Sequence, residues 1–179
     1  VTTLEFDLVV TGDSQLLVSH EPYFSFEFCA DIQGNRMDTI VNIYELSYAQ
    51  IEQYDCGSLI HPRFPDQEKM KVSKPLLRDA FSAIERFIEE NQLAKVNYNI
   101  ELKTRVDADE IFHPRPEVFS EMVYELVSSY GLWNRVNIQS FDFRTLQFFD
   151  ASYPKVRLAL LIENDLGWQT NIDSLGFNP

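Results

Sequence analysis

The sequence has 179 residues, of which 45% are hydrophobic and 13% aromatic, which is enough for one packed domain and too apolar for a disordered chain. Its 28 acidic and 15 basic residues give a formal net charge of −13. This balance excludes a broad basic surface for a nucleic-acid backbone, so we expect no nucleic-acid partner. Converging carboxylates can instead hold a hard divalent cation, which supplies the positive charge that a phosphate substrate needs.

Cysteine content and hydropathy leave the compartment open. Cys29 and Cys56 are too few for a disulfide-dense scaffold and lack zinc-binding spacing, but they allow one optional disulfide. No apolar run approaches the roughly 18 residues of a membrane span, so we expect no stable membrane insertion. No signal-peptide pattern is present, yet the sequence opens at Val1 rather than Met, which is compatible with removal of a leader. The protein is expected in the periplasm, in a secreted form or in the cytoplasm, with the periplasm preferred.

The first predicted elements are two strands joined by a turn. Residues 3–10 are apolar and β-branched, residues 11–14 predict a turn that includes Asp13, and residues 16–18 predict a short second strand. Pro22 ends regular pairing, so His20 should lie near the rim of the sheet.

Residues 24–75 follow no regular pattern, and only residues 48–54 look helical. A stretch this long without periodicity is typical of a functional excursion or a small inserted subdomain. We therefore predict a single domain over residues 1–179, with an insertion subdomain over residues 24–75.

Helices and strands alternate in the rest of the chain. Pro75 and the helical spacing of the apolar residues after it predict a helix that ends near Asn91. The other predicted elements are strands over 96–103, 136–141 and 157–162 and helices over 117–130 and 143–151. This order indicates parallel strands in an α/β sheet or barrel. Neither Gly-x-Gly-x-x-Gly nor a P-loop motif is present, so a nucleotide-binding α/β fold is not supported.

Acidic residues recur on two of the predicted strands. Alternate side chains of a strand share a face, so Glu5 and Asp7 point the same way, as do Glu101 and Lys103. Carboxylates near the ends of parallel strands are expensive to bury unless they bind a cation or hydrogen-bond partners. The three carboxylates could therefore converge on one metal ion. The alternative is a solvated edge strand, with Glu101 and Lys103 in an ordinary ion pair.

His20 follows the acidic strand closely and is a candidate for proton transfer, with a surface or turn histidine as the alternative. His61 and His113 each precede a proline, which indicates loop packing or exposure rather than chemistry. Glu163 ends the last predicted strand and could reach a pocket rim. The aromatic side chains predicted as core are Phe141, Phe148 and Phe149. No nucleophile elbow or cysteine motif supports covalent acyl transfer.

Four segments match one family pattern in order and spacing. They are Leu4-Glu5-Phe6-Asp7-Leu8-Val9-Val10-Thr11-Gly12-Asp13, Leu17-Val18-Ser19-His20-Glu21, Asn99-Ile100-Glu101-Leu102-Lys103 and Ile138-Gln139-Ser140-Phe141. Together they resemble the glycerophosphodiester phosphodiesterase family, whose pattern is an acid-x-acid strand, a turn, a histidine followed by an acid, and a later Glu-Leu-Lys strand. The resemblance spans most of the chain.

The resemblance implies an α/β fold, part of a TIM (β/α)₈ barrel of the phospholipase-C-like phosphodiesterase type, with a small insertion after the second barrel strand. It also implies a site. Glu5, Asp7 and Glu101 would be ligands of a divalent cation, Ca²⁺ or Mg²⁺, His20 would be catalytic, and Lys103 would lie near the substrate phosphate.

The sequence departs from the family pattern in places. Glu21 stands where Asp is usual, and Gly12 and Ser14 stand where lysine and glycine are common. The family's His-Arg-Gly strand and Glu-Asn-Thr segment, with a second catalytic histidine and a phosphate-binding arginine, precede the matched region. Four barrel strands are predicted, against eight in the fold. We therefore expect this sequence to be part of a longer barrel, stable alone only through self-association or the remaining segments.

The activity implied is metal-dependent hydrolysis of a small glycerophosphodiester to an alcohol and glycerol 3-phosphate. One alternative is a related phosphodiesterase of phospholipid head groups, in which Tyr48, Tyr54, Ile60 and Phe64 of the insertion would cover a small substrate or contact lipid. The acidic charge weakens attraction to a membrane. A second alternative is a non-catalytic, metal-dependent ligand-binding protein. A glycosidase fits less well, because Lys103 and His20 suit phosphate better.

Overall fold

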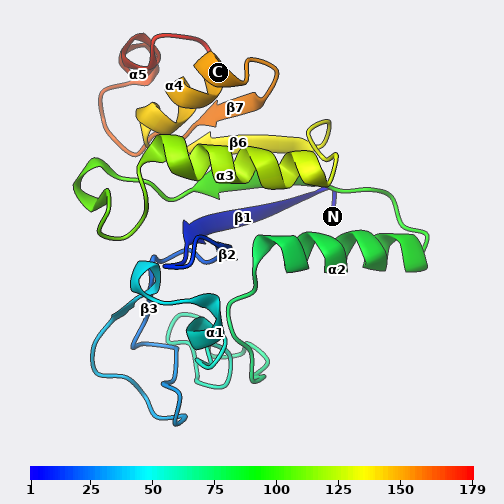
Figure 1. Ribbon diagram of the computed structural model, residues 1–179, viewed down its shortest axis with the longest axis vertical. Helices are drawn as coiled ribbons and strands as arrows, with labels where there is room; N and C mark the ends of the chain where they lie inside the picture. Colours follow the sequence, from blue (N-terminus) through cyan, green and yellow to red (C-terminus); the bar gives the residue numbers. More distant parts are fainter.

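The centre of the fold is a five-stranded sheet. The computed structural model describes residues 1–179, and the strand order is β2-β1-β5-β6-β7 (Figure 1). The parallel strands are β1 (Thr3–Val10), β5 (Asn97–Leu102), β6 (Val136–Ser140) and β7 (Arg157–Leu160). The predicted parallel strands are thus confirmed: β1 has the predicted bounds, and the other three are shorter by one or two residues at one or both ends.

The second strand differs in direction from the others. β2 (Leu16–Val18) pairs antiparallel with β1, with Val9 opposite Leu17. The reason is local, because the turn over residues 11–14 reverses the chain and folds β2 back along β1. The segment predicted as an insertion therefore follows an antiparallel edge strand and not one of the parallel strands.

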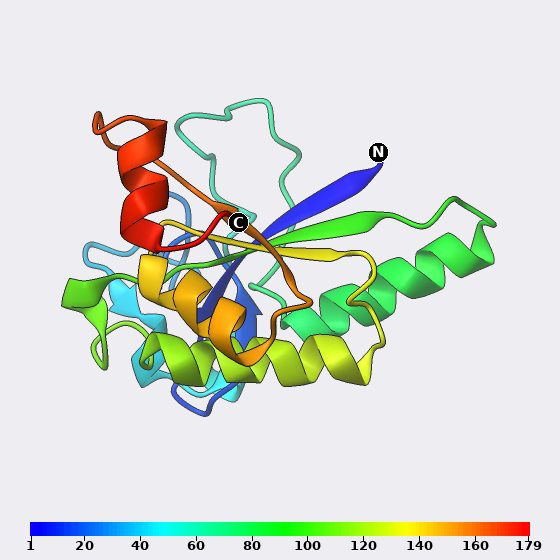
Figure 2. The same cartoon turned by 90° about the horizontal axis from the view of Figure 1, so that it is seen from above.

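Three helices cover one face of the sheet (Figure 2). They are α2 (Leu77–Glu90), α3 (Pro116–Ser129) and α4 (Phe143–Ser152), all predicted from the sequence to within a few residues. Phe81, Phe119 and Phe149 of these helices are fully buried against Tyr98 and Ile138 of the strands. Because strand side chains alternate, residues one position along, such as Asn99 and Gln139, face away from the helices. One face of the sheet is thus the main core, and the other carries polar side chains.

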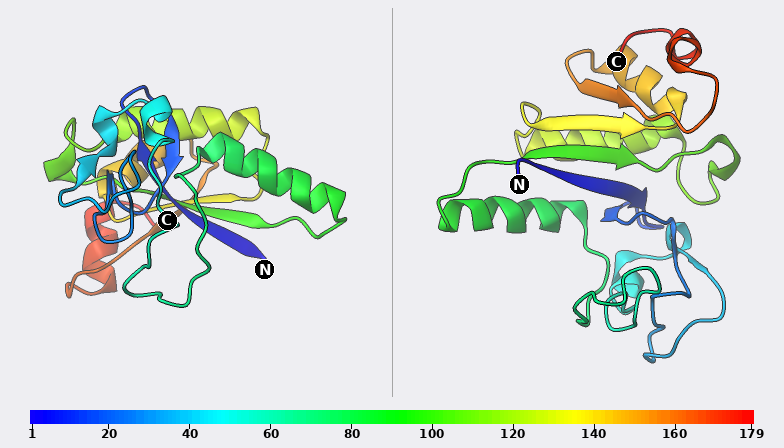
Figure 3. Two further views of the ribbon diagram at one scale, coloured as in Figure 1. Left: turned by 90° about the horizontal axis from the view of Figure 1, so that it is seen from below. Right: turned by 180° about the vertical axis from the view of Figure 1, so that it is seen from behind.

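Residues 24–75 lie at the β2 edge and consist mostly of irregular loops (Figures 1 and 3). The regular elements in or near this segment are β3 (Tyr23–Phe24), β4 (Val41–Asn42), the 3₁₀ turn η1 (Ile43–Glu45) and α1 (Tyr48–Ile51), so the predicted helix over 48–54 is a single turn. A second core of seven buried residues joins this segment to the sheet: Val9, Leu17, Phe24, Cys29, Ile43, Ile51 and Leu76. The optional disulfide forms between Cys29 and Cys56. The subdomain boundaries stay a prediction.

The opposite edge carries the C-terminal elements. A helix that the sequence did not predict, α5 (Trp168–Leu175), follows β7 and contacts α4 (Figure 3). It ends at Gly176, whose positive φ of 91° closes the helix in the left-handed conformation that glycine favours. A second 3₁₀ turn, η2 (Val106–Ala108), follows β5. No helix combines the length and hydropathy needed to cross a bilayer.

Candidate functional site

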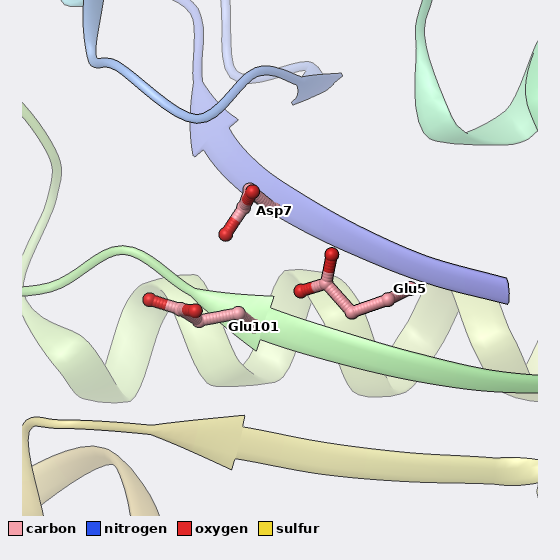
Figure 4. A group of neighbouring side chains, drawn as sticks. All are labelled: Glu5, Asp7 and Glu101. Carbon is pink, nitrogen blue, oxygen red and sulfur yellow. The ribbon is translucent and has the colours of Figure 1, made fainter. Parts of the chain in front are cut away.

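Three carboxylates meet on the polar face of the sheet. Asp7 of β1 pairs in register with Glu101 of β5, and Glu5 lies two residues before Asp7 on the same face. Each side chain offers an oxygen, and these three oxygens lie within 4.8 Å of one another. Figure 4 shows the carboxyl groups gathered on one side of the two strands. The predicted convergence of Glu5, Asp7 and Glu101 is therefore observed.

One ammonium faces these three acids. Lys103 Nζ lies 2.8 Å from Glu101 Oε1 and 3.4 Å from Asp7 Oδ1. Although Glu5 is an exposed residue, partial burial of its carboxyl group raises its pKa, and the neighbouring charges of Asp7 and Glu101 raise it further. Burial also raises the pKa of Glu101, although Lys103 opposes that shift. Three carboxylates thus face a single ammonium, and an all-oxygen, carboxylate-rich donor set fits a hard divalent cation such as Ca²⁺ or Mg²⁺.

A pocket of about 540 Å³ opens beside the acids. Glu101 and Lys103 form part of its wall, and His20 lies on the wall contributed by the chain after β2. The His20 side chain is 68% exposed, and its Nδ1 lies 2.8 Å from Glu21 Oε1. The structure thus brings His20, Glu101 and Lys103 to one pocket, whereas Glu5 and Asp7 do not line it; Asp7 lies beside Glu101 on the neighbouring strand.

The other two histidines pack in loops, as predicted. His113 is buried, its Nε2 accepts a hydrogen bond from the Arg105 backbone N–H at 2.9 Å, and its Nδ1 lies 2.8 Å from the Pro114 carbonyl oxygen. It therefore holds the loop after β5, which lines the pocket. His61 stacks on Phe28 within the insertion, with ring centres 4.7 Å apart.

The prediction for Phe141 was wrong. Phe149 is fully buried, but Phe141 is 40% exposed and lines the pocket. Phe141 directly follows the last residue of β6 and precedes Asp142, the N-cap of α4, so its side chain projects at the edge of the sheet rather than beneath the helix. Glu163 lines the same pocket, as the sequence suggested.

Four insertion residues that the head-group alternative assigned to covering a small substrate or contacting lipid lie away from the pocket. Tyr54 stacks on Phe24 at 4.2 Å, and Tyr48 packs against the second core. Ile60 and Phe64 are half exposed, and none of these four side chains lines the pocket that holds His20.

Several polar contacts at the site were missed from the sequence. Gln139 Nε2 donates to Glu5 Oε1 at 3.0 Å, and Arg105 pairs with Asp107 at 2.6 Å on the pocket wall. Arg144 joins Asp109 to Asp142. For Gln139, a signal was present, because alternation on β6 places its side chain on the face that carries the acids of β1 and β5.

Solved structures share this fold. A Silicibacter pomeroyi protein whose name assigns it to the glycerophosphoryl diester phosphodiesterases has a TM-score of 0.82 and 23% identity, with 99% of this chain and 63% of that one covered. An Oleispira antarctica phosphodiesterase, in complex with the product sn-glycerol-3-phosphate, has a TM-score of 0.69 and 20% identity, with 99% and 61% covered. The chain thus spans about three fifths of these structures. The α/β sheet is part of a TIM barrel of the phospholipase-C-like type.

Comparisons of sequence agree with the fold. No curated protein sequence matches the chain significantly. The family model described as "Glycerophosphoryl diester phosphodiesterase family" matches residues 1–172, which include the acid-x-acid strand, His20 and the Glu-Leu-Lys strand. The chain therefore belongs to the glycerophosphoryl diester phosphodiesterase family.

Proposed function

We propose that this protein hydrolyses glycerophosphodiesters to an alcohol and glycerol 3-phosphate, with the help of Ca²⁺ or Mg²⁺. The observation that carries the proposal is the approach of three carboxylates to within 4.8 Å, beside Lys103, in a chain of this family. The sn-glycerol-3-phosphate bound to the Oleispira antarctica phosphodiesterase supports the same substrate class.

The proposed roles follow from position and charge. Glu5, Asp7 and Glu101 would hold the cation. A bound divalent cation lowers the pKa of a glycerol hydroxyl and neutralises charge that builds on the phosphoryl oxygens. Lys103, fixed by Asp7 and Glu101, adds a positive charge near the phosphate. His20 would exchange a proton through Nε2, because its Nδ1 is hydrogen-bonded to Glu21.

The test is hydrolysis of glycerophosphocholine by the native-length protein, with and without EDTA. We expect EDTA to abolish release of glycerol 3-phosphate, Glu101→Gln to remove metal-dependent activity, and His20→Ala to lower kcat by about 100-fold or more. His61→Ala is the matched control, because that histidine packs in the insertion away from the pocket, and it should retain wild-type activity.

Two other outcomes would overturn the proposal. Binding of Ca²⁺ or Mg²⁺ without turnover of any diester would identify a non-catalytic binding protein. Turnover of intact phospholipid in place of glycerophosphocholine would identify a head-group phosphodiesterase.

We also propose a periplasmic or secreted location. The Cys29–Cys56 disulfide supports it, because structural disulfides persist mainly in oxidising compartments. Mass spectrometry of the protein from fractionated cells, with free thiols alkylated before lysis, would test this. An alkylated, reduced pair in a cytoplasmic fraction would contradict it.

A further inference from the structure

A row of three side-chain amides crosses the polar face of the sheet and ends at Glu5. Asn137 Nδ2 donates to Asn99 Oδ1 at 2.7 Å, and Asn99 Nδ2 donates to Gln139 Oε1 at 2.7 Å. Gln139 Nε2 then donates to Glu5 Oε1 at 3.0 Å. The strand register explains the row, because Asn99 lies between Glu5 on β1 and Asn137 on β6.

The row has a single direction. Each amide offers one carbonyl acceptor and one NH₂ donor group. The Gln139 carbonyl accepts from Asn99, so its NH₂ group must face Glu5. With the Gln139 amide reversed, its carbonyl would face a carboxylate and its NH₂ would face the NH₂ of Asn99, which gives two repulsive contacts. The Glu5 carboxylate, which only accepts, sets this direction, and the hydrogen bonds from Asn137 to Asn99 and from Asn99 to Gln139 hold the Gln139 amide in it.

The Glu5 carboxylate has a different hydrogen-bonding partner from the carboxylates of Asp7 and Glu101. Lys103 contacts Asp7 and Glu101, whereas Glu5 receives its hydrogen bond from Gln139. Gln139 is only 8% exposed, so packing restrains its side chain, while Glu5 is an exposed residue with a flexible stem. A rigid donor that restrains a flexible ligand lowers the entropy lost when that ligand binds a cation.

We propose that Gln139 is a positioning residue that orients the Glu5 carboxylate for cation binding, and that Asn99 and Asn137 act through Gln139. The inference rests on the proposed cation site of Glu5, Asp7 and Glu101, and it does not require that the protein hydrolyse a diester.

The test measures the dissociation constants of Ca²⁺ and Mg²⁺ by titration calorimetry on the native-length protein. Gln139→Met keeps the side-chain length and removes the donor, and we expect it to weaken binding of the preferred cation by about tenfold or more. Asn99→Ala keeps Gln139 but frees the Gln139 amide to rotate, so we expect a smaller, several-fold decrease in cation affinity. Gln147→Met is the matched control, because Gln147 of α4 donates to the Leu175 carbonyl and should not affect cation affinity.

A double variant separates positioning from a general effect on the sheet. In a Glu5→Gln background, Gln139→Met should cause no further loss of cation affinity, since the carboxylate that it orients is absent. The inference would be overturned if Gln139→Met lowered cation affinity in the Glu5→Gln background by the same factor as in the wild type. Wild-type affinity in Gln139→Met would also overturn it, and if that variant fails to fold, wild-type affinity in Asn99→Ala decides in the same way. A wild-type protein that binds neither cation would overturn it too.

The two proposals can fail separately. If the wild-type protein binds a cation and Gln139→Met weakens the binding, but no diester is turned over, the positioning role stands and the hydrolytic function fails. If the protein shows EDTA-sensitive hydrolysis and Gln139→Met leaves cation affinity unchanged, the hydrolytic function stands and the positioning role fails.

Discussion

Lys74 is a largely buried cation next to the chain segment that carries His20. Its Nζ donates to Ser19 Oγ at 2.7 Å and lies 5.9 Å from the centre of the Phe24 ring. Burial lowers the pKa of Lys74 to about 8, and the charge of Glu21 opposes that shift only in part. The folded protein therefore holds this proton less tightly than the unfolded chain does.

The depressed pKa predicts a rise in stability with alkaline pH. Below pH 8 the ammonium is charged in both states, and its burial cost is fully present. Between pH 8 and the ordinary value of 10.5, the native state has lost the proton and the unfolded state still binds it, so the free energy of unfolding increases with pH. Urea unfolding at pH 7 and pH 9.5 should show a gain of about 2 kcal/mol in the wild type relative to Lys74→Met. Parallel pH curves for the two proteins would contradict the assignment.

The packing around Gly12 explains why a glycine stands at this position of the turn, where the family pattern has another residue. A Cβ atom at this position would lie 2.9 Å from the Tyr44 carbonyl oxygen and 3.2 Å from Leu46 N, and the Gly12 N–H donates to the Leu46 carbonyl at 2.8 Å. The turn between β1 and β2 thus packs directly on the backbone around η1, which leaves no room for a side chain.

We therefore expect Gly12→Ala to lower the free energy of unfolding by about 1–3 kcal/mol, because backbone atoms on both sides must shift. Ser14→Ala, at an exposed position of the same turn, should change it by less than about 0.5 kcal/mol. Denaturant titration measures both. Equal stability of Gly12→Ala and the wild type would mean that the turn can move away from η1 without cost.

At the scale of elements, one arginine connects the loop after β5 to the start of α4. Arg144 Nη1 lies 2.6 Å from Asp109 Oδ2, and Arg144 Nη2 lies 2.6 Å from Asp142 Oδ2. Asp142 is also the N-cap of α4 and accepts from the Arg144 N–H at 3.0 Å. Since the same loop forms part of the pocket wall, this network connects the helix to the site.

Arg144→Met should loosen that loop. The hydrogen bond from Arg144 lowers the pKa of Asp109, so the interaction stabilises the protein above the ordinary carboxyl pKa, near 4, and is lost as the pH falls below it. We expect a loss of about 1 kcal/mol at pH 7, because the pair is partly exposed, and a smaller difference from the wild type below pH 4. Hydrogen exchange should increase in residues 104–113. Arg78→Met, at an exposed pair on α2, is the control, and similar exchange in both variants would argue against the network.

At the scale of the molecule, two cores of unequal size are joined through β1 and β2. The main core lies between the sheet and helices α2, α3 and α4, while the smaller one lies in residues 24–75 and includes Val9 and Leu17 of the strands. The Cys29–Cys56 disulfide closes a chain separation of 27 residues within the smaller part. The small core thus has a covalent constraint, and the large core has none.

Removal of the disulfide should act on the smaller core first. A loop of this length predicts a loss of about 3.5 kcal/mol for the Cys29→Ala/Cys56→Ala variant. Hydrogen exchange should rise in residues 24–75 at a denaturant concentration at which α2, α3 and α4 remain protected. A uniform loss of protection over both parts would show instead that they unfold as one unit.

Local patterns were sufficient for much of the fold and of the site. Helical spacing predicted α2, α3 and α4, and alternation placed Glu5 with Asp7 and Glu101 with Lys103, because a side chain's direction depends on its own backbone period. Spacing between motifs then identified the family. The helical and strand patterns involve residues close in the chain, and the order and spacing of the motifs can be compared along the sequence, so neither needed knowledge of packing.

Contacts between distant residues required the folded structure. The β1–β5 register brings Glu5 and Asp7 to Glu101, and no local period encodes which strands pair or in which register. The Cys29–Cys56 disulfide, left optional by the sequence, forms in the same way, through packing of residues far apart in the chain. The side chain of Phe141 faces the pocket because β6 ends one residue earlier. Such pairings form when the favourable packing of many residues outweighs the entropy lost in closing the loops between them. That balance involves the whole chain, so only the tertiary structure shows its outcome.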